Sequence, residues 1–235
     1  MDIESMIIAI DGPAGAGKSS VAQKLASSLG LNYLDTGAIY RALTLEALRD
    51  HSDLDDAERL SDMARSMDIQ MRYYGRRRPP YRILLNGEDV TRKIRSGEVS
   101  VHVSQVSSHK GVRLEMIRKQ RRMAEKGGIV VEGRDVGTAV FPEADLKIFL
   151  TASLKERALR RYREMKKEGY EVSINSLQQE MVRRDHQDTT RAHNPLKKAH
   201  DAMMVDTTDM SVSRVVRSLI KMVKERADTI GEGGA

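Results

Sequence analysis

A glycine-rich loop that links a short apolar run to a helical pattern constrains this chain more than any other feature. The loop spans residues 12–19 and reads GPAGAGKS, which matches the pattern G-x-x-x-x-G-K-[ST] in full. Small residues let successive backbone N–H groups turn inward around a phosphate, and a helix that starts there adds the positive end of its dipole. The apolar run at residues 6–11 precedes the loop as an expected buried strand. The sequence therefore predicts a site for a nucleoside triphosphate.

Two side chains of this loop have specific expected roles. Lys18 should reach the β- and γ-phosphates of ATP, and the Ser19 hydroxyl should be a ligand of Mg²⁺. The residues expected to bind the nucleotide are Gly12, Pro13, Ala14, Gly15, Ala16, Gly17, Lys18, Ser19 and Ser20. The alternative is a tight strand-to-helix turn with incidental glycines, which would bind no ligand. A strand before the loop and a helix after it favour phosphate binding.

Four further apolar runs indicate strands of the same sheet, and helical patterns separate them. These runs lie at residues 32–35, 128–133, 146–151 and 202–207. After the glycine-rich loop, Val21, Leu25 and Leu29 recur on one helical face, and Gly30 supplies a stop signal. Strands that alternate with helices predict an α/β fold of the P-loop NTPase type, with a five-stranded parallel sheet flanked by helices.

The connection between residues 35 and 128 is long enough to hold an insert. It has roughly ninety residues, whereas a whole βαβ unit needs about 30. Apolar residues alternate over two short stretches, and Asn86-Gly87 is a strong hairpin signal, so a small antiparallel sheet is expected. We assign residues 64–95 to this insert, with a helical return to about residue 126, and residues 1–63 and 96–235 to the core. The tip at residues 76–80 receives no role.

Charge and composition narrow the class of partner. The formal net charge is +6, which suits anionic ligands. The chain has no cysteine, which fits a reducing cytoplasm, and it has no apolar run of the ~18 residues that a membrane span needs. With no tryptophan and two phenylalanines, it offers few rings on which nucleic-acid bases could stack. A nucleic-acid-dependent ATPase and a regulatory module without turnover are the less favoured alternatives.

Arginines gather in two expected helices in the second half of the chain. A capping box at residues 153–156 opens the first of them. In the second, the spacing of Arg184, Asp188 and Arg191 would place all three on one face if the helix continues. Guanidinium groups neutralise two phosphates that repel one another, as a kinase of a small anion requires. A GTPase is less favoured because the chain has no evident guanine-reading NKxD sequence.

Four segments are more specific than the phosphate loop alone: IDGPAGAGKSS, YLDTGAIYRALT, EGRDVGTAVFPEADLKIFLTAS and RRDHQDTTRAHNPL. Together they resemble bacterial cytidylate kinases, and the similarity extends from Ile8 to about the last expected helix. It implies transfer of the γ-phosphoryl group of MgATP to CMP or dCMP, with an insert on the acceptor (NMP) side and a helical lid at about residues 153–195. We expect a cytoplasmic monomer whose partners are ATP and CMP or dCMP, and neither nucleic acid nor a membrane.

The resemblance also implies roles for individual residues. The positions that match those engaging the acceptor phosphate or its surroundings are Thr36, Arg41, Arg134 and Arg191. The positions that match those reading cytosine are Ser104, Arg113 and Asp135. Those near the acceptor sugar are Arg184 and Asp188, and the lid arginines on the ATP side are Arg157 and Arg161. With Lys18, the two lid arginines form the expected catalytic set.

Two of these assignments have alternatives, and one further residue has two possible roles. Arg41 could lie on a solvated helix face, and Asp135 could form a surface ion pair or cap a helix. Glu132 ends an expected strand where a Walker-B carboxylate would lie. It would hold either a Mg²⁺-bound water or only the loop around Gly133, and both alternatives remain open.

Overall fold

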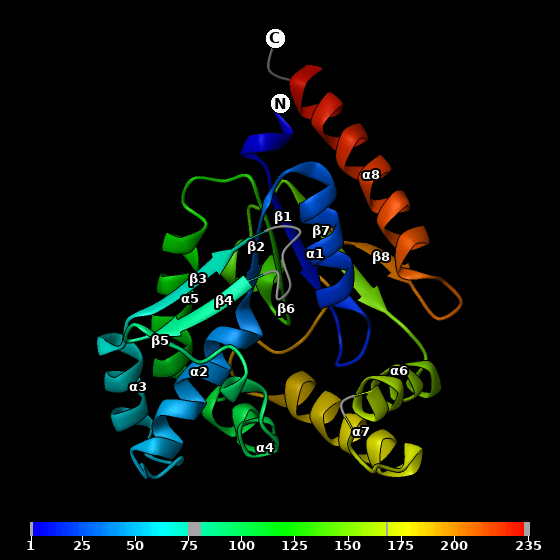
Figure 1. The fold of residues 1–235 in the computed structure, drawn as a ribbon. Helices are drawn as coiled ribbons and strands as arrows, with labels where there is room; N and C mark the ends of the chain where they lie inside the picture. The colour runs from blue at the N-terminus through cyan, green and yellow to red at the C-terminus, as the bar shows by residue number, and fades with distance from the viewer. Residues whose placement is uncertain (1, 75–80, 168, 233–235) are drawn as a thin grey trace.

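The central element of the fold is a five-stranded parallel sheet (Figure 1). The computed structural model describes residues 2–74, 81–167 and 169–232, so the tip at residues 76–80 lies outside the described residues. The strand order is β2-β6-β1-β7-β8. The strands are β1 (Ile7–Asp11), β2 (Asn32–Asp35), β6 (Ile129–Gly133), β7 (Leu146–Thr151) and β8 (Met203–Asp206). The five predicted strands and their parallel arrangement are thereby confirmed.

Helices and short helical turns connect these strands. The α-helices are α1 (Lys18–Leu29), α2 (Thr36–Arg49), α3 (Ala57–Ser66), α4 (Gly97–Val106), α5 (Lys110–Met123), α6 (Leu154–Lys167), α7 (Ile174–Thr190) and α8 (Val212–Glu232). The short turns are η1 (Ile3–Ser5), η2 (Lys93–Arg95) and the π-helical η3 (Val136–Val140). In Figure 1, α1 and α8 lie beside the sheet on the right, while α3 and α5 lie on the left.

The first long helix follows the predicted pattern. Val21 and Leu25 of α1 are buried against the sheet, and Leu29 packs at the edge of the same core. Gly30 ends the helix with a φ of 73°, and its N–H donates to the Ala26 carbonyl. Glycine adopts this left-handed conformation without the steric cost that a Cβ would bring. The helix therefore starts at Lys18 and stops where the sequence indicates.

A second, antiparallel sheet lies within the stretch predicted as an insert. It comprises β3 (Ile69–Tyr73), β4 (Tyr81–Leu85) and β5 (Glu88–Asp89). Asn86 and Gly87 both have positive φ values, 49° and 87°, as a two-residue hairpin turn requires. The buried side chains of this sheet join the main core, and the rings of Tyr33 and Tyr81 lie 5.6 Å apart. The division into core and insert stays a prediction.

The helix pair α6 and α7 has a hydrophobic cluster of its own. Ala158, Leu177 and Met181 are buried together in this cluster, apart from the main core of the sheet. Figure 1 shows the pair at the lower right, with α4 across from it at the bottom of the molecule. A separate cluster lets two helices keep their mutual packing while they shift relative to the sheet.

Register brings the carboxyl ends of three strands to one edge of the sheet. Asp11 of β1 pairs with Gly133 of β6, and Asp35 of β2 pairs with Glu132. In chain order, β2 and β6 are added on one side of β1 and β7 and β8 on the other, so this edge contains a topological switch point. In open α/β sheets, ligands bind at such a point, outside the carboxyl ends of the strands.

Candidate functional site

A cavity of about 930 Å³ opens at this edge of the sheet. The phosphate loop, the start of α2 and the inner face of α4 line one part of it, and α6 and α7 line another. Its size suits two small ligands or one extended ligand, because pockets for small molecules typically measure about 300–1,000 Å³. The loop, the base-reading candidates and the second arginine-rich helix thus share one space.

The phosphate loop depends on glycines whose backbone other residues rarely adopt. Gly15 and Gly17 have φ values of 75° and 88°. At Gly12, with a φ of 151°, an added Cβ would lie 2.1 Å from the Leu150 carbonyl oxygen. The loop is therefore held against β7 so closely that a side chain at Gly12 would displace it.

Lys18 is buried at the centre of this loop. Its ammonium donates a hydrogen bond of 2.8 Å to the Pro13 carbonyl. Burial and the neighbouring Arg134 charge hold the pKa of Lys18 well below its usual range. A buried cation beside a second cation favours an anionic ligand, which would lower the cost of keeping both charged.

Glu132 lies at the end of β6, beside Lys18. Its carboxylate accepts a hydrogen bond of 2.7 Å from the Tyr33 hydroxyl, and the Ser19 side chain lies nearby. Burial and the nearby Asp35 charge raise the pKa of Glu132. The carboxylate and hydroxyl oxygens at this point are the hard donors that Mg²⁺ prefers.

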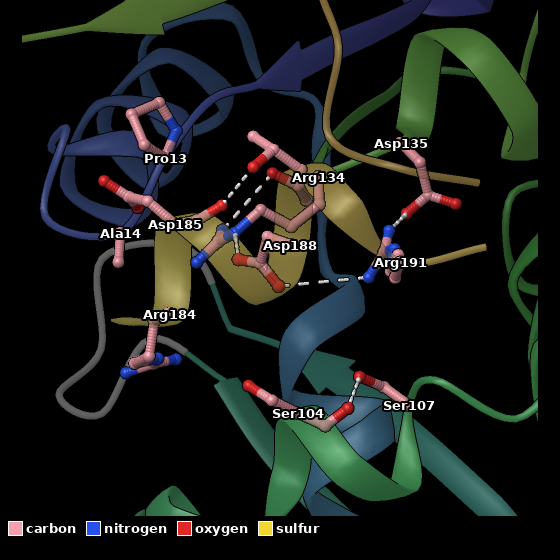
Figure 2. Close-up of polar contacts among 12 residues, drawn as sticks. Pro13, Ala14, Ser104, Ser107, Arg134, Asp135, Arg184, Asp185, Asp188 and Arg191 are labelled. Atoms are coloured by element: carbon pink, nitrogen blue, oxygen red, sulfur yellow. Dashed lines mark hydrogen bonds and ion pairs between the residues drawn. The ribbon is translucent and has the colours of Figure 1, made fainter. Parts of the chain in front are cut away.

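Three residues predicted to read a base or engage a phosphate form one ion-pair network. The Arg113 guanidinium, which is 2% exposed, pairs with one carboxylate oxygen of Asp135. Arg191 pairs with the other oxygen at 3.2 Å, and Figure 2 shows Arg191 between Asp135 and Asp188. The surface-ion-pair alternative for Asp135 is wrong, because this carboxylate is buried.

The walls around this network are polar and aromatic. Arg113 also donates to the Ser107 carbonyl at 3.0 Å and lies over the Tyr40 ring, 5.3 Å from its centroid. Ser104, predicted to contact the base, lines the cavity beside Ser107 on the α4 side (Figure 2). The cavity wall here offers donors, an acceptor and a ring within one enclosed region.

A second ion pair connects β6 to α7. Arg134 Nε donates to Asp188 at 2.7 Å (Figure 2). Burial works against ionisation of Asp188, but the Arg134 charge and hydrogen bond hold the pKa of this carboxyl below its usual value. Arg184 lines the same cavity, and its Nε is buried without a hydrogen-bond partner. The partnerless Nε is a donor that a ligand could satisfy.

Arg41 and Thr36 lie at the start of α2. Arg41 donates to the Ser100 hydroxyl at 2.9 Å, and Thr36 donates to the Glu132 carbonyl at 2.8 Å. Burial and the Arg184 charge lower the pKa of Arg41 to about 10. The solvated-face alternative for Arg41 is excluded by its contacts, since the guanidinium donates to the Ile94 carbonyl and the Ser100 hydroxyl.

The two predicted lid arginines differ in their surroundings. Arg157 is buried and donates both to the Ala14 carbonyl at 3.0 Å and to Asp185 at 2.7 Å. Arg161 is more exposed, pairs with Glu164 at 3.2 Å and lines the cavity. Arg157 therefore holds α6 and α7 to the phosphate loop in this conformation, whereas Arg161 faces the cavity.

The condition for a shared helical face of Arg184, Asp188 and Arg191 is not met in the structure. Helix α7 ends at Thr190, and Arg191 has a ψ of 142°, so Arg191 does not continue the helical face of Arg184 and Asp188. Pro195 disfavours helical backbone at the preceding residue, and Asn194 has a φ of 49°. The turn carries Arg191 back, where its Nε donates to the Asn194 carbonyl at 2.8 Å.

Sequence reasoning missed three cavity residues. Arg160 donates to the Thr207 carbonyl at 2.6 Å, and its place in the arginine-rich helix was the available signal. Tyr40 lies within the segment YLDTGAIYRALT, in which only Thr36 and Arg41 were predicted to contact a ligand. Arg95 lies 3.7 Å from Asp35 and beside Tyr81, a contact across distant segments that no local pattern indicates.

Among residues 2–74, 81–167 and 169–232, no group of three or more His, Cys, Asp or Glu side chains could hold a metal ion. Within the same ranges, no helix is long and apolar enough to cross a membrane.

Comparisons with known proteins match this chain to one family. The family model described as cytidylate kinase matches residues 8–225. A cytidylate kinase of Bacillus velezensis is 46% identical over 225 residues, which is 95% of this chain and 99% of that protein. A cytidylate kinase of Bacillus subtilis is 43% identical and covers 95% of this chain and 99% of its own length. A solved gluconokinase of Sinorhizobium meliloti has the same fold, with a TM-score of 0.53 at 14% identity and 99% coverage of both chains.

Proposed function

The chain belongs to the cytidylate kinase family, and from this premise we propose that it transfers the γ-phosphoryl group of MgATP to CMP or dCMP. The products are ADP and CDP or dCDP, which belong to pyrimidine nucleotide metabolism. The observation that carries the proposal is one cavity that is lined both by residues 14–20 of the phosphate loop and by the Arg113–Asp135 pair. A donor beside an acceptor suits the edge of a cytosine ring.

The acceptor in this reaction requires little help from a protein base. A phosphate monoester has its second pKa at about 6, so its attacking oxygen is mostly ionised near pH 7. Catalysis therefore rests on in-line positioning and on neutralising the charges of two phosphates. The residues proposed to do this from the protein are Lys18, Arg41, Arg134, Arg157, Arg161 and Arg191.

Each group has a distinct proposed position. Lys18 binds the β- and γ-phosphates, and Arg161 faces the transferring group from α6. Arg41, Arg134 and Arg191, with Thr36, surround the acceptor phosphate. Arg184 and Asp188 lie near the acceptor sugar, while Ser104, Arg113 and Asp135 contact the base. We further propose that Arg157 turns from the Ala14 carbonyl toward the ATP phosphates when substrates bind.

The oxygen donors near the loop fit Mg²⁺. Ser19 and Glu132 line the same cavity, and both present the hard oxygens that this ion prefers. The Ser19 hydroxyl would bind the ion, and Glu132 would hold one of its waters. When bound, the ion would neutralise part of the negative charge on the phosphates.

The enzyme is proposed to act as a monomer in the cytoplasm. Every residue assigned to the site comes from a single chain and lines or borders one cavity. The lack of cysteine is consistent with a reducing compartment.

A panel of acceptors tests the proposed function. ADP formation is measured with CMP, dCMP, UMP, AMP, GMP and shikimate as separate acceptors, and with single-stranded DNA. We expect rates with CMP or dCMP well above those with the other acceptors. Stimulation by DNA alone would support a nucleic-acid-dependent ATPase. ATP binding without turnover on any acceptor would support a regulatory module.

The lid is expected to gain order when both nucleotide sites are filled. Amide hydrogen exchange over residues 153–195 should slow by about tenfold with a bisubstrate analogue that joins ATP to CMP. The separate cluster of α6 and α7 lets the pair move as a unit. Helix α8, which packs in the main core, provides the internal control. Equal exchange over residues 153–195 with and without the analogue would contradict lid closure.

The pH dependence should follow the substrate phosphate. At saturating MgATP, kcat/KM for CMP should rise up to about pH 6 and then level off, because the acceptor oxygen is then deprotonated. The measurement spans pH 5 to 9 and is compared with a direct titration of CMP. A further rise centred between pH 7 and 8, absent from that titration, would reveal a protein base.

A further inference from the structure

Asp11 is a buried carboxylate to which the proposed mechanism gives no task. It is the last residue of β1, directly before Gly12 of the phosphate loop, and only 5% of it is exposed. Its register partner on β6 is Gly133, which directly precedes Arg134 and Asp135. The position of Asp11 is thus fixed between the donor loop and the segment proposed to contact the base.

Both carboxylate oxygens of Asp11 accept backbone hydrogen bonds from that segment. Oδ1 accepts from the Val136 N–H and Oδ2 from the Gly137 N–H, each at 2.8 Å. These two groups begin η3, where the first N–H groups of a helical turn have no partner within the turn. An anion at this end also meets the positive end of the local backbone dipoles. Asp11, the last residue of β1, therefore caps the N-terminal end of η3.

The approach of η3 to Asp11 leaves little room for a side chain at position 137. A Cβ added to Gly137 would lie 3.2 Å from Lys147 Cδ and 3.4 Å from Asp11 Oδ2. Lys147 fixes the far side of this segment, since its ammonium donates to the Pro142 carbonyl and pairs with Asp201 at 2.7 Å. The backbone that follows Asp135 is thus held from two sides.

We propose that Asp11 is a positioning residue for base selection, because it fixes the backbone directly after Asp135 and so the place of the Asp135 carboxylate. The inference rests on the proposed function, in which Asp135 contacts cytosine. The charged groups whose fields reach Asp11 are Asp135 and Lys18. Burial, the largest influence, raises the pKa of Asp11 to about 6, while the N–H groups of Gly137 and Val136 lower it, so the carboxylate is mostly ionised at pH 7.

The test is the ratio of kcat/KM for CMP to kcat/KM for UMP in the Asp11→Asn variant. An amide presents one acceptor oxygen, so one of the two N–H groups faces an NH₂ donor instead. Losing a buried bond to a charged group should reduce the CMP:UMP ratio by about tenfold. Most of the change should appear in KM for CMP, with the Kd for a non-hydrolysable ATP analogue within about twofold of wild type. The substrate phosphate is common to both acceptors, so its titration cancels in the ratio.

Asp145→Asn is the matched control. Asp145 also accepts a backbone hydrogen bond, from the Ile7 N–H at 2.8 Å, but at the opposite end of β1. This variant should lose some thermal stability and keep the wild-type ratio. An Asp11→Asn enzyme that loses both activities in proportion, with the ratio unchanged, would overturn the inference and leave Asp11 a purely structural role.

Gly137→Val decides the question if Asp11→Asn does not fold. A Cβ at this position would already lie 3.2 Å from Lys147 Cδ and 3.4 Å from Asp11 Oδ2, so the two further methyl groups of valine should displace η3 from an intact Asp11 and the CMP:UMP ratio should again fall about tenfold. An unchanged ratio in this variant would also overturn the inference. Absence of CMP-dependent ADP formation by the wild-type enzyme is a separate outcome, which would refute the proposed function and the inference together.

Discussion

Replacement of Lys18 by methionine is expected to reduce kcat by roughly 10³-fold or more while the fold is retained. Methionine fills a similar volume but removes the cation proposed to bind the β- and γ-phosphates. The ammonium is buried beside Arg134, and its lowered pKa reflects the cost of charge at that place. Removing it therefore relieves the cost of burying the charge and the repulsion from Arg134 in the free enzyme, and the melting temperature should stay equal or increase. The loss should thus appear in phosphoryl transfer rather than in stability.

The Lys18 prediction is checked by steady-state kinetics with CMP together with thermal unfolding. Lys24→Met is a suitable control, because Lys24 belongs to the same helix and its ammonium donates to the Ser213 hydroxyl in an exposed position. The control should keep nearly full activity. Turnover close to wild type in Lys18→Met would refute the role assigned to the loop, since no other residue is proposed to take this position.

The parts of the fold that follow from local periodicity could be predicted from the sequence. Strands buried on both faces appear as short apolar runs, and Gly30 and the Asn86-Gly87 turn mark where a helix stops and a hairpin reverses. The phosphate loop could be predicted because its function requires small residues at fixed spacing. These signals are local, so tertiary contacts had little scope to override them.

The parts that depend on distant contacts could not be predicted in this way. Arg157 follows a helical pattern, but its bond to the Ala14 carbonyl depends on how two helices meet a loop about 140 residues away in sequence. Asp11 reads as the end of a strand, and only the β1–β6 register brings it to the N–H groups of η3. Of these three examples, only the end of α7 before Arg191 could have been predicted from nearby residues, because Asn194 and Pro195 follow it.

Asparagine at position 135 is expected to reduce kcat/KM for CMP and to narrow the preference for CMP over UMP. Cytosine presents an exocyclic amine donor, whereas uracil presents a carbonyl acceptor at the same place. The Asp135 carboxylate can accept from the amine but repels the carbonyl, and Arg113 can donate to the ring acceptors of cytosine. UMP would leave buried polar groups unpaired, which discriminates more strongly than a difference in size.

The size of this effect follows from the two arginines that share Asp135. The carboxylate pairs with Arg113 and Arg191 and keeps further lone pairs for a ligand. An amide offers either its oxygen or its NH₂, so it can meet uracil as well as cytosine, but its NH₂ then faces guanidinium donors. The CMP:UMP ratio should therefore fall by the ~1–3 kcal/mol of one good base contact, or about 5- to 150-fold.

The decisive comparison is between Asp135→Asn and Asp62→Asn, each measured with CMP and UMP at saturating MgATP. Asp62 also pairs with a cation, Arg65, but its side chain is 59% exposed and it does not line the cavity among the described residues. Loss of an exposed partner should cost little and leave the ratio unchanged. If Asp135→Asn keeps the wild-type ratio while both activities fall together, Asp135 orients Arg113 and Arg191 without contacting the base. In that case the selectivity for cytosine must come from Arg113 and the α4 wall around Ser104.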